Sequence, residues 1–327
     1  MNILVTGCFG FIGSNLVPKL LWEGHNVIGF DTLVNAAEDA SHRMKENSGD
    51  RWGNFKFFRI DIREYASMYA ICIHENIEMV IHLAALGSVP RSFMMPMDFI
   101  DVNEKGFASI AYLASSLLTV KRVVYASSSS IYGETQTFKK TEGREGQPKS
   151  PYAISKKQNE MFAKVWSRQV GLEFVGLRFF NVYGPGQSAF SAYSAVIPKF
   201  ICEEKPTVHG DGTTARDFTF VDDVCKAITL SMKAALPSLH VAVNVGTGRS
   251  TTLNQLLDML RKKHLATYGP GRECDVSFSV ADTNYAEKTI GFIAEVGIEE
   301  GLKRTRKYFD GVTVGKPETE VSVSERT

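Results

Sequence analysis

Short apolar runs alternate with segments of helical periodicity along the first half of the chain. The runs Ile3–Val5, Asn26–Phe30 and Phe55–Ile60 predict strands, and the spacing of apolar residues over Ile12–Trp22 and Glu64–His74 predicts helices. Strands separated by helices are typical of a parallel sheet covered on both faces. The alternation continues with strands predicted at Met79–Leu83, Arg122–Ser127 and Glu173–Arg178 and helices at Asp98–Leu118 and Tyr152–Arg168.

The pattern changes after about Asn181, where Gly, Pro and Ser become frequent and the apolar runs become shorter. Short helices are predicted at Val221–Ala235 and Thr252–Lys263, and Val241–Val245 is expected to return to the main sheet. We therefore expect a large domain at residues 1–180, joined by later segments near 216–245, and a smaller lobe that mainly comprises residues 181–310. The polar residues 311–327 are expected to form a flexible tail.

Composition and charge exclude several classes of partner. The net charge of the 327 residues is +1, which provides no electrostatic footprint for nucleic acid or for an anionic membrane. The N-terminus lacks the features of a signal peptide, and the uncharged stretch Gly106–Val120 is too short to span a bilayer. Five cysteines without a CxxC pair or zinc-ligand spacing predict neither a disulfide framework nor a metal site. We expect a cytoplasmic protein.

A glycine-rich loop, TGCFGFIG, follows the first predicted strand and opens a helix. Gly7, Gly10 and Gly13 have GxxGxxG spacing, a variant of the loop that lets a pyrophosphate approach backbone amides and a helix N-terminus. Asp31 ends the second strand, where a carboxylate binds the adenosine ribose of NAD and repels the 2′-phosphate of NADP. The alternative is a tight turn with incidental glycines and a turn aspartate. The combination favours an NAD site.

Acid–base chemistry is indicated by a YxxxK pair and a serine-rich strand end. Tyr152 and Lys156 lie on one face of a predicted helix, where the cation is expected to lower the pKa of the phenol. The serines Ser127–Ser130 end an apolar strand, at the edge where open α/β sheets bind ligands. A surface Tyr–Lys pair and a serine-rich turn are the alternatives, and they explain the whole ordered set less well.

The complete set of motifs resembles the extended short-chain dehydrogenase/reductase family, in its nucleotide-sugar epimerase/dehydratase group. The set comprises TGCFGFIG, Asp31, HLAA at His82–Ala85, SSSSIYG, YAISK and LRFFNVYGPG at Leu177–Gly186, and the likeness extends from about Met1 to Phe309. The resemblance implies a Rossmann-type doubly wound parallel sheet that binds NAD and a smaller C-terminal α/β lobe that binds a nucleotide sugar. It also implies a homodimer that pairs through helices near Asp98–Leu118 and Tyr152–Arg168.

The resemblance also implies which residues form the cofactor site and the catalytic triad. Asp61 and Ile62 would flank the adenine, and Asn103 would support the active-site helix, although a turn aspartate and a polar helix position are alternatives. The implied catalytic residues are Ser128, Tyr152 and Lys156. The implied cofactor-binding residues are Gly7, Phe9, Gly10, Phe11, Ile12, Gly13, Asp31, Asp61, Ile62, Ala84, Ala85, Asn103, Tyr152 and Lys156.

Within this family, the residues after the triad hydroxyl distinguish the reactions. Epimerases, dehydratases and decarboxylases all begin when the tyrosine takes the O4 proton and C4 gives a hydride to NAD, which forms a 4-keto sugar. Dehydratases typically carry Asp-Glu directly after the triad hydroxyl, and decarboxylases carry Glu two residues after it. Here these positions are Ser129 and Ser130, which cannot act as carboxylic acids. The sequence therefore favours epimerisation.

Further segments resemble the substrate site of enzymes that act on UDP-sugars. LGSVPRS resembles the loop of UDP-N-acetylhexosamine 4-epimerases, and a small Ser279 would leave room for an N-acetyl group or have no selective role. RECDV resembles a nucleotide-closing segment in which Cys274 replaces the usual glycine. The guanidinium of Arg91 would lie near the phosphates or the sugar, or would be a solvated loop charge. The implied substrate-binding residues are Ser88, Arg91, Ser128, Ser129, Ser130, Asn181, Arg216, Arg272, Asp275 and Ser279.

The leading hypothesis is an NAD-dependent 4-epimerase that interconverts UDP-N-acetylglucosamine and UDP-N-acetylgalactosamine. The alternatives within the family are a UDP-glucuronate or UDP-glucose 4-epimerase and, with less support, a dehydratase or a decarboxylase. A non-catalytic NAD-binding regulator is the least favoured alternative because Tyr152 and Lys156 are both retained.

Overall fold

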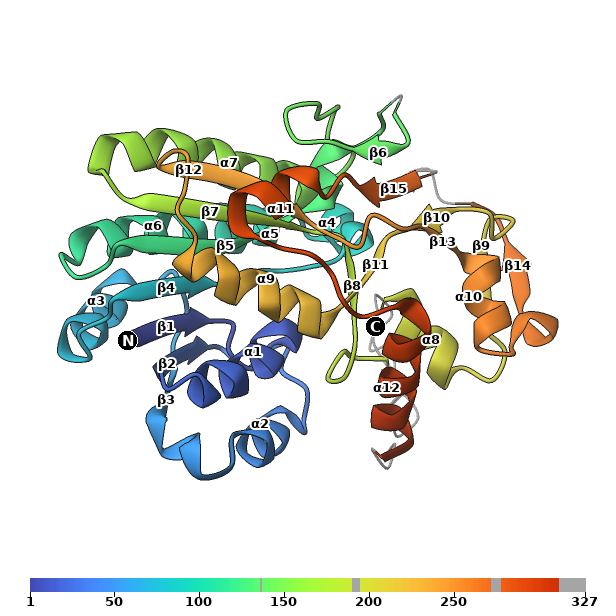
Figure 1. Ribbon diagram of the computed structural model, residues 1–327, viewed down its shortest axis with the longest axis horizontal. Coiled ribbons are helices and arrows are strands. Elements are labelled where there is room, and N and C mark those ends of the chain that lie inside the picture. Colours follow the sequence, from blue (N-terminus) through green and yellow to red (C-terminus); the bar gives the residue numbers. More distant parts are fainter. Residues whose placement is uncertain (136, 190–194, 272–277, 312–327) are drawn as a thin grey trace, which may run out of the picture.

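A seven-stranded parallel sheet forms the centre of the computed structural model, which describes residues 1–135, 137–189, 195–271 and 278–311 (Figure 1). Strands predicted from the apolar runs occur within one or two residues of their expected bounds. The doubly wound parallel α/β fold is therefore confirmed. In sheet order the strands are β12 (His240–Val245), β7 (Glu173–Phe179), β5 (Arg122–Ser128), β4 (Met79–His82), β1 (Asn2–Thr6), β2 (Asn26–Asp31) and β3 (Phe55–Arg59).

The strand order reverses at β1, and this reversal locates the ligand crevice. The chain adds β2 and β3 on one side of β1 and then returns to place β4 on the other side. In open α/β sheets, ligands bind beyond the carboxyl ends of the strands at such a switch point. The glycine-rich loop follows β1, and the serine run begins in the last residues of the nearby strand β5.

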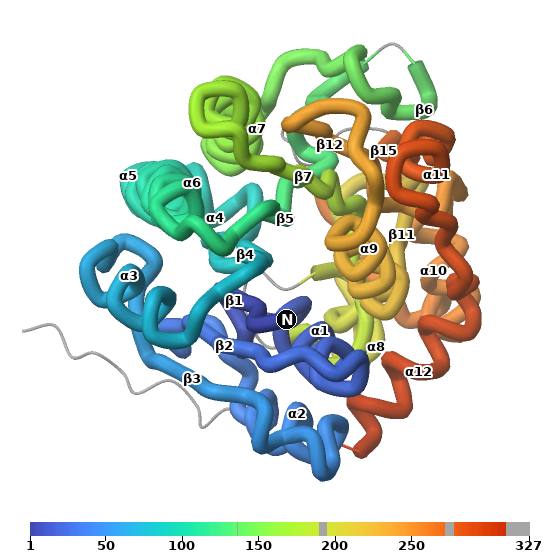
Figure 2. Tube along the Cα trace, turned by 60° about the vertical axis from the view of Figure 1, so that its left-hand side comes forward, coloured from blue at the N-terminus to red at the C-terminus, as the bar shows by residue number. Residues whose placement is uncertain are grey.

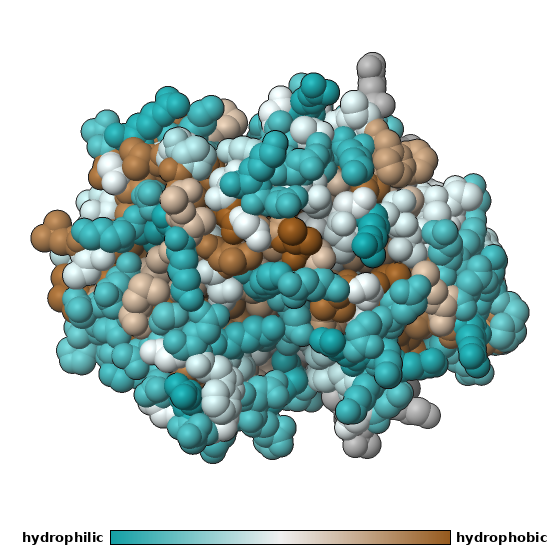
Figure 3. Space-filling model, in the orientation of Figure 1, coloured by the Kyte–Doolittle hydropathy of each residue, from teal (hydrophilic) through white to brown (hydrophobic). Residues whose placement is uncertain are grey.

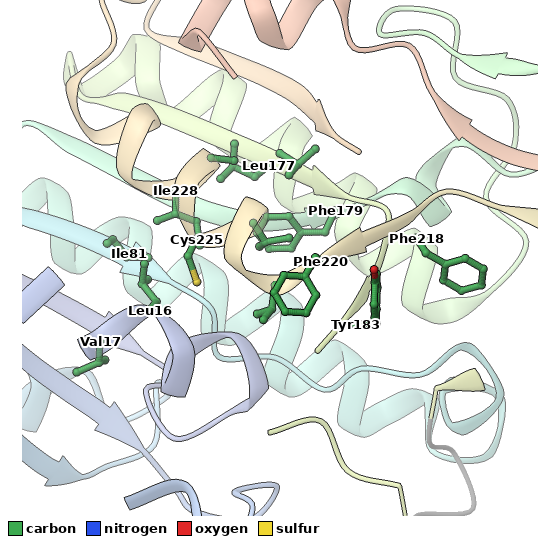
Figure 4. Packing of buried hydrophobic residues seen from close by; sticks show 14 of the residues in the cluster. Leu16, Val17, Ile81, Leu177, Phe179, Tyr183, Phe218, Phe220, Cys225 and Ile228 are labelled. Atoms are coloured by element: carbon green, nitrogen blue, oxygen red, sulfur yellow. The ribbon is translucent and has the colours of Figure 1, made fainter. Parts of the chain in front are cut away.

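Helices cover both faces of the sheet (Figure 2). One face carries α1 (Phe11–Trp22) and α9 (Val221–Lys233), and the other carries α3 (Tyr65–His74), α6 (Gly106–Ser116) and α7 (Pro151–Val170). Figure 4 shows side chains of α1 and α9 packed with residues of β4 and β7, and the same cluster continues to the aromatic residues Tyr183, Phe218 and Phe220. Burial of this apolar surface is the main force that holds the helices on the sheet.

The helix predicted over Asp98–Leu118 is interrupted. The structure has α5 (Pro96–Phe99), a π-helical segment at Ile100–Lys105 and then α6. Widened turns of this kind often lie at functional sites, and this one carries the buried Asn103. Helices that the apolar pattern did not predict are α2 (Ala40–Ser48), α4 (Val89–Met94), α8 (Val196–Cys202), α11 (Asn284–Ile290) and α12 (Ile298–Gly311).

The C-terminal half forms small sheets beside the main one. A four-stranded sheet has the order β13 (Thr251–Thr252), β10 (Ala215–Arg216), β15 (Phe278–Ala281) and β6 (Lys139–Lys140). The strand β12 returns to the main sheet, as expected, and the predicted helix Thr252–Lys263 is shorter, with α10 at Leu253–Met259. Two-stranded pairs are formed by β8 (Asn181–Tyr183) with β11 (Phe218–Phe220) and by β9 (Thr207–His209) with β14 (Thr267–Gly269).

The expected flexible tail lies outside the described residues, apart from Gly311 at the end of α12. None of the helices in the described ranges combines the length and apolar character that a membrane crossing requires. Among the described residues, no three His, Cys, Asp or Glu side chains are grouped so that they could hold a metal ion.

Candidate active site

The glycine-rich loop is packed too tightly for side chains at two of its three glycines. Gly7 has a positive φ of 70°, and a Cβ atom at Gly13 would lie 2.2 Å from the Gly7 carbonyl oxygen. Gly10 is the N-cap of α1 and has no side chain that could cap the helix, and the first turn of α1 contains no acidic residue. The helix N-terminus, which includes Phe11 and Ile12, therefore presents backbone amides to an anion. These features fit the diphosphate of a dinucleotide.

Asp31 lies at the end of β2 beside this loop. Its carboxylate accepts hydrogen bonds from the backbone N–H groups of Phe9, at 2.9 Å, and Leu33, at 2.8 Å. The carboxylate is thus fixed against the loop with lone pairs that remain for ribose hydroxyls. The next basic residue in the sequence, Arg43, donates to Ser14 Oγ at 2.8 Å and is largely buried. The guanidinium of Arg43 is therefore engaged at α1.

In the turn after β3, the contacts of Asp61 are those of a turn aspartate, which was the alternative to an adenine contact. The Asp61 carboxylate accepts from the backbone N–H and the guanidinium of Arg63, which lowers the pKa of Asp61. Ile62 is buried, and its side chain packs against Gly106. Asp61 thus forms a turn with Arg63, and contacts of Asp61 and Ile62 with an adenine stay a prediction.

The segment after β4 is held against the loop and against α7. Ala84 donates its backbone N–H to Thr6 Oγ1 at 3.2 Å, and the half-buried Ala85 follows it. The Asn103 side chain accepts from the Leu86 N–H at 2.8 Å and donates to the Leu86 carbonyl at 3.0 Å. It also donates to Ser155 Oγ on α7 at 3.1 Å. Asn103 therefore bridges this segment and the helix that carries the YxxxK pair.

Ser128, Tyr152 and Lys156 lie together at the carboxyl end of β5. Ser128 is the last residue of β5, and α7 begins after the N-cap Ser150, so that Tyr152 is in its first turn. Burial raises the pKa of Tyr152, and the neighbouring hydroxyl of Ser128 offsets part of that rise. One turn later, the buried Lys156 Nζ donates to the Ala126 carbonyl at 2.9 Å.

The expected pKa of Tyr152 is wrong for this structure. The sequence predicted that Lys156 would lower it, whereas desolvation of the phenol is the largest effect and raises it. Desolvation also lowers the pKa of Lys156 to about 8. At pH 7 the ammonium is still mostly protonated, but it is directed to the backbone of β5.

The serines after Ser128 determine how its hydroxyl is oriented. Ser130 donates to Ser128 Oγ twice, through its backbone N–H at 3.2 Å and its hydroxyl at 2.9 Å. Ser128 Oγ is thus an acceptor on this side, which leaves its own proton for a different acceptor. Ser129 is the first residue of the 3₁₀ turn Ser129–Tyr132.

A buried ion pair beneath the triad was not predicted from the sequence. Arg178 on β7 donates to both carboxylate oxygens of Glu160, at 2.9 and 2.8 Å, and Ser127 Oγ donates to the same carboxylate at 2.6 Å. Glu160 follows Lys156 by one helical turn, so its spacing on the face of α7 was a usable signal. The ion pair ties α7 to β5 and β7.

The predicted substrate residues fall into two groups. Ser88 has a positive φ of 86° and caps α4 by accepting from the N–H of Arg91, whose guanidinium donates to Asn35 Oδ1 at 3.4 Å. In the four-stranded sheet, Arg216 on β10 pairs in register with the buried Ser279 on β15.

Asn181 begins β8 and has an exposed side chain. Its backbone is joined to the residue that follows Arg216, because the Asn181 N–H donates to the Asp217 carbonyl at 3.0 Å. Arg272 and Asp275 lie outside the described residues, as does Cys274.

Comparison with known proteins gives consistent matches over most of the chain. A UDP-glucuronate 4-epimerase from Thermodesulfobacterium geofontis is 36% identical over 92% of this chain and 94% of its own length. The crystal structure of a UDP-glucose 4-epimerase from Thermotoga maritima with UDP-glucose is 34% identical, covers 95% of this chain and 99% of its own, and has a TM-score of 0.85. A UDP-N-acetylglucosamine 4-epimerase from Methanobrevibacter ruminantium in complex with UDP-N-acetylmuramic acid is 32% identical, with a TM-score of 0.85 and coverage of 94% and 98%.

The family model of the NAD dependent epimerase/dehydratase family matches residues 3–246. This range contains the glycine-rich loop, the serine run and the YxxxK pair, so the match confirms the resemblance predicted from these motifs and NAD as the cofactor. With this match and the relatives above, the chain belongs to the NAD dependent epimerase/dehydratase family.

Proposed function

We propose that the protein catalyses the NAD-dependent 4-epimerisation of a UDP-sugar, with UDP-N-acetylglucosamine and UDP-N-acetylgalactosamine as the preferred pair. One observation carries this proposal. The hydroxyls of Ser128 and Tyr152 meet at the carboxyl end of β5, and the two positions that would divert the reaction to elimination or decarboxylation are the serines Ser129 and Ser130.

In the proposed reaction, the residues of the triad act on the proton of the sugar O4 hydroxyl. NAD, when bound, takes up a hydride from a sugar carbon and can return it. Tyr152 accepts and returns the O4 proton, and the Ser128 hydroxyl donates a hydrogen bond to the same sugar oxygen. Lys156 on α7 supplies a positive charge beside β5, since a pKa of about 8 keeps it mostly protonated at pH 7. No other acid is required, because an epimer has the same composition as its substrate.

The proposed cofactor site comprises the loop from Gly7 to Gly13, Asp31, the turn at Asp61, the segment after β4 and Asn103. The nucleotide sugar would bind between this domain and the smaller lobe, where Asn181 and Arg216 would hold the diphosphate because a guanidinium suits phosphate oxygens. We retain the division at about residue 180 as part of this proposal.

The identity of the sugar rests on a small side chain. Ser279 is buried on β15 next to Arg216 and leaves more space than an aromatic residue would leave. The relative from Methanobrevibacter ruminantium, named for UDP-N-acetylglucosamine, supports this choice. UDP-glucuronate is the second candidate because the relative with 36% identity is named a UDP-glucuronate 4-epimerase, and the hydroxyl of Ser129 is a donor that suits a sugar carboxylate.

We also propose a homodimer that pairs through α6 and α7. Tyr112 on α6 and Met161 and Val165 on α7 are exposed by 52%, 60% and 71%. Apolar side chains are visible on the surface where these helices lie, at the left of Figure 3. On α7 this stripe lies opposite the face that carries Tyr152 and Lys156, so pairing would leave the proposed site open.

The proposed function is tested by incubating the NAD-loaded protein with UDP-N-acetylglucosamine, UDP-glucose and UDP-glucuronate in parallel. We expect NMR to show inversion at C4, fastest for UDP-N-acetylglucosamine, and mass spectrometry to show an unchanged mass. Tyr152→Phe is the matched inactive control. A product lighter by one water would identify a dehydratase and contradict the argument from Ser129 and Ser130. Faster turnover of UDP-glucuronate would contradict the proposed sugar but not the reaction.

A further inference from the structure

Asp217 lies between β10 and β11, at the point where three of the proposed substrate residues converge. It directly follows Arg216 in the chain. Its backbone N–H donates to the Ser279 carbonyl at 2.8 Å, and its carbonyl accepts from the Asn181 N–H at 3.0 Å. Asn181, Arg216 and Ser279 are therefore each attached to Asp217, by one hydrogen bond or by the peptide bond itself.

The Asp217 side chain connects the same point to the main sheet. The residue is fully buried, and Oδ1 accepts from the N–H and hydroxyl of Thr247, both at 2.8 Å, and from Thr219 Oγ1 at 3.4 Å. Oδ2 accepts from the N–H groups of Gly248 at 2.8 Å and Ala281 at 3.2 Å. Thr247 and Gly248 follow β12 of the central sheet, whereas Ala281 ends β15 of the lobe.

The groups around this carboxylate suit only a side chain that accepts hydrogen bonds. The five groups that contact the carboxylate are all N–H or O–H donors, and four of these contacts are 3.2 Å or shorter. A Cβ atom at residue 246 would lie 2.8 Å from Oδ2 and 2.6 Å from the Ala281 side chain, so glycine is required to let the carboxylate approach. An amide in place of the carboxylate would direct an N–H₂ group at some of these donors and leave them unsatisfied.

We propose that Asp217 is a positioning residue that fixes Asn181, Arg216 and Ser279 relative to one another and to the central sheet, so that the UDP part of the substrate is bound. The inference rests on the proposed function, because it assigns these three residues to the UDP-sugar. Asp217 touches no substrate in this proposal. It acts through the residues that do, and its loss should weaken binding of UDP much more than binding of NAD.

The chain contains a matched control for this role. Asp223 on α9 is also buried, and its carboxylate accepts from the backbone N–H groups of Glu295 at 2.9 Å and Val296 at 3.0 Å. Asp223 thus has the same chemical character, but it connects α9 to the segment before α12. Asp223→Asn removes a buried carboxylate that contacts none of the proposed substrate residues.

The experiment measures the Kd of UDP and of NAD by calorimetry for the full-length protein and its variants. We expect Asp217→Asn to weaken UDP binding about tenfold or more, since one lost hydrogen-bond equivalent near a charged group corresponds to about that factor. Thr247→Val removes one donor to Asp217, together with the acceptor of the exposed Arg249 N–H. It should weaken UDP binding about threefold, which corresponds to less than one such equivalent. Both variants should bind NAD as the wild type does, and Asp223→Asn should leave the Kd of UDP unchanged.

A double variant separates positioning from general destabilisation. If Asp217 acts through Arg216, then Asp217→Asn should weaken UDP binding much less in an Arg216→Gln background than in the wild type. If Asp217→Asn does not fold, then Thr247→Val alone decides by the same comparison. Unchanged UDP affinity in the folded variants, or an equal loss in Asp223→Asn, overturns the inference while the proposed function stands. Wild-type protein that does not bind UDP overturns both.

Discussion

Replacing Lys156 with methionine should stabilise the fold while it removes activity. Lys156 is 3% exposed, and its ammonium donates to the Ala126 carbonyl at 2.9 Å. Burial therefore lowers the pKa of this lysine from 10.5 to about 8. Methionine has a similar length and carries no charge, so the substitution removes the desolvation cost without leaving a large cavity.

The magnitude follows from the pKa shift. At pH 7 the shift corresponds to about 3 kcal/mol of destabilisation, because each pKa unit is worth about 1.4 kcal/mol. Loss of the hydrogen bond to Ala126 offsets about 1 kcal/mol, which leaves a net gain of about 2 kcal/mol. For a chain of this length the unfolding entropy is about 0.7 kcal/mol per kelvin, so the Tm should rise by about 3 °C.

The stability gained by Lys156→Met must decrease as the pH rises. Between about pH 8 and pH 10.5 the unfolded lysine binds a proton that the folded one does not bind, so wild-type stability rises with pH in this window. The advantage of Lys156→Met is therefore fully present at pH 7 and is lost as the pH approaches 10.5. Other groups titrate in this range, but they are common to both proteins and cancel in the difference.

Thermal unfolding of NAD-free protein, followed by circular dichroism at pH 7 and pH 9.5, measures this difference. Lys164→Met is the control, because Lys164 is an exposed lysine on the same helix and its removal should change the Tm little. The reasoning is refuted if Lys156→Met lowers the Tm at pH 7, or if its gain is equal at both pH values.

Three further predictions follow from the site and the surface. Tyr152→Phe should remove nearly all turnover but keep UDP binding in calorimetry, whereas Ser128→Ala should lower kcat by about 10²-fold because it removes one transition-state hydrogen bond; near-normal turnover of Tyr152→Phe would show that another group takes the proton. The wild type should bind NAD more tightly than NADP, and Asp31→Asn should narrow that difference in calorimetry because it removes the charge facing a 2′-phosphate; equal wild-type affinities would reject this role of Asp31. In sedimentation velocity the wild type should be a dimer at micromolar concentration, and Met161→Glu with Val165→Glu should be a monomer because charges would be buried at the interface; a monomeric wild type would exclude the dimer.

The strands were predictable because buried parallel strands are short, continuous apolar runs. Two of the helices that the sequence did not reveal, α2 and α12, bury few residues. In α2 the buried residues are Ala40, Met44 and Ser48, and α12 buries Leu302 and Phe309 within a strongly charged segment. Their apolar spacing was present but was obscured by polar neighbours.

The site was predictable as a set of positions but not as a set of contacts. The spacing placed Tyr152 and Lys156 on one helix face, whereas the pKa of Tyr152 depends on how deeply the tertiary structure buries it. The pairing of Asp61 with Arg63 and the donors around Asp217 likewise depend on segments that are distant in the sequence or on the geometry of a turn. Such contacts leave no local pattern.

The return of β12 to the central sheet has a consequence for synthesis of the chain on the ribosome. One edge of its partner strand β7 stays unpaired until residues 240–245 have been made. All strands of the sheet except β12 are complete by residue 179. An unpaired apolar edge is a template for association with other chains. Synthesis that stops near residue 180 therefore yields an aggregation-prone fragment, and the nascent protein must protect this edge for about sixty further residues before β12 can pair with it.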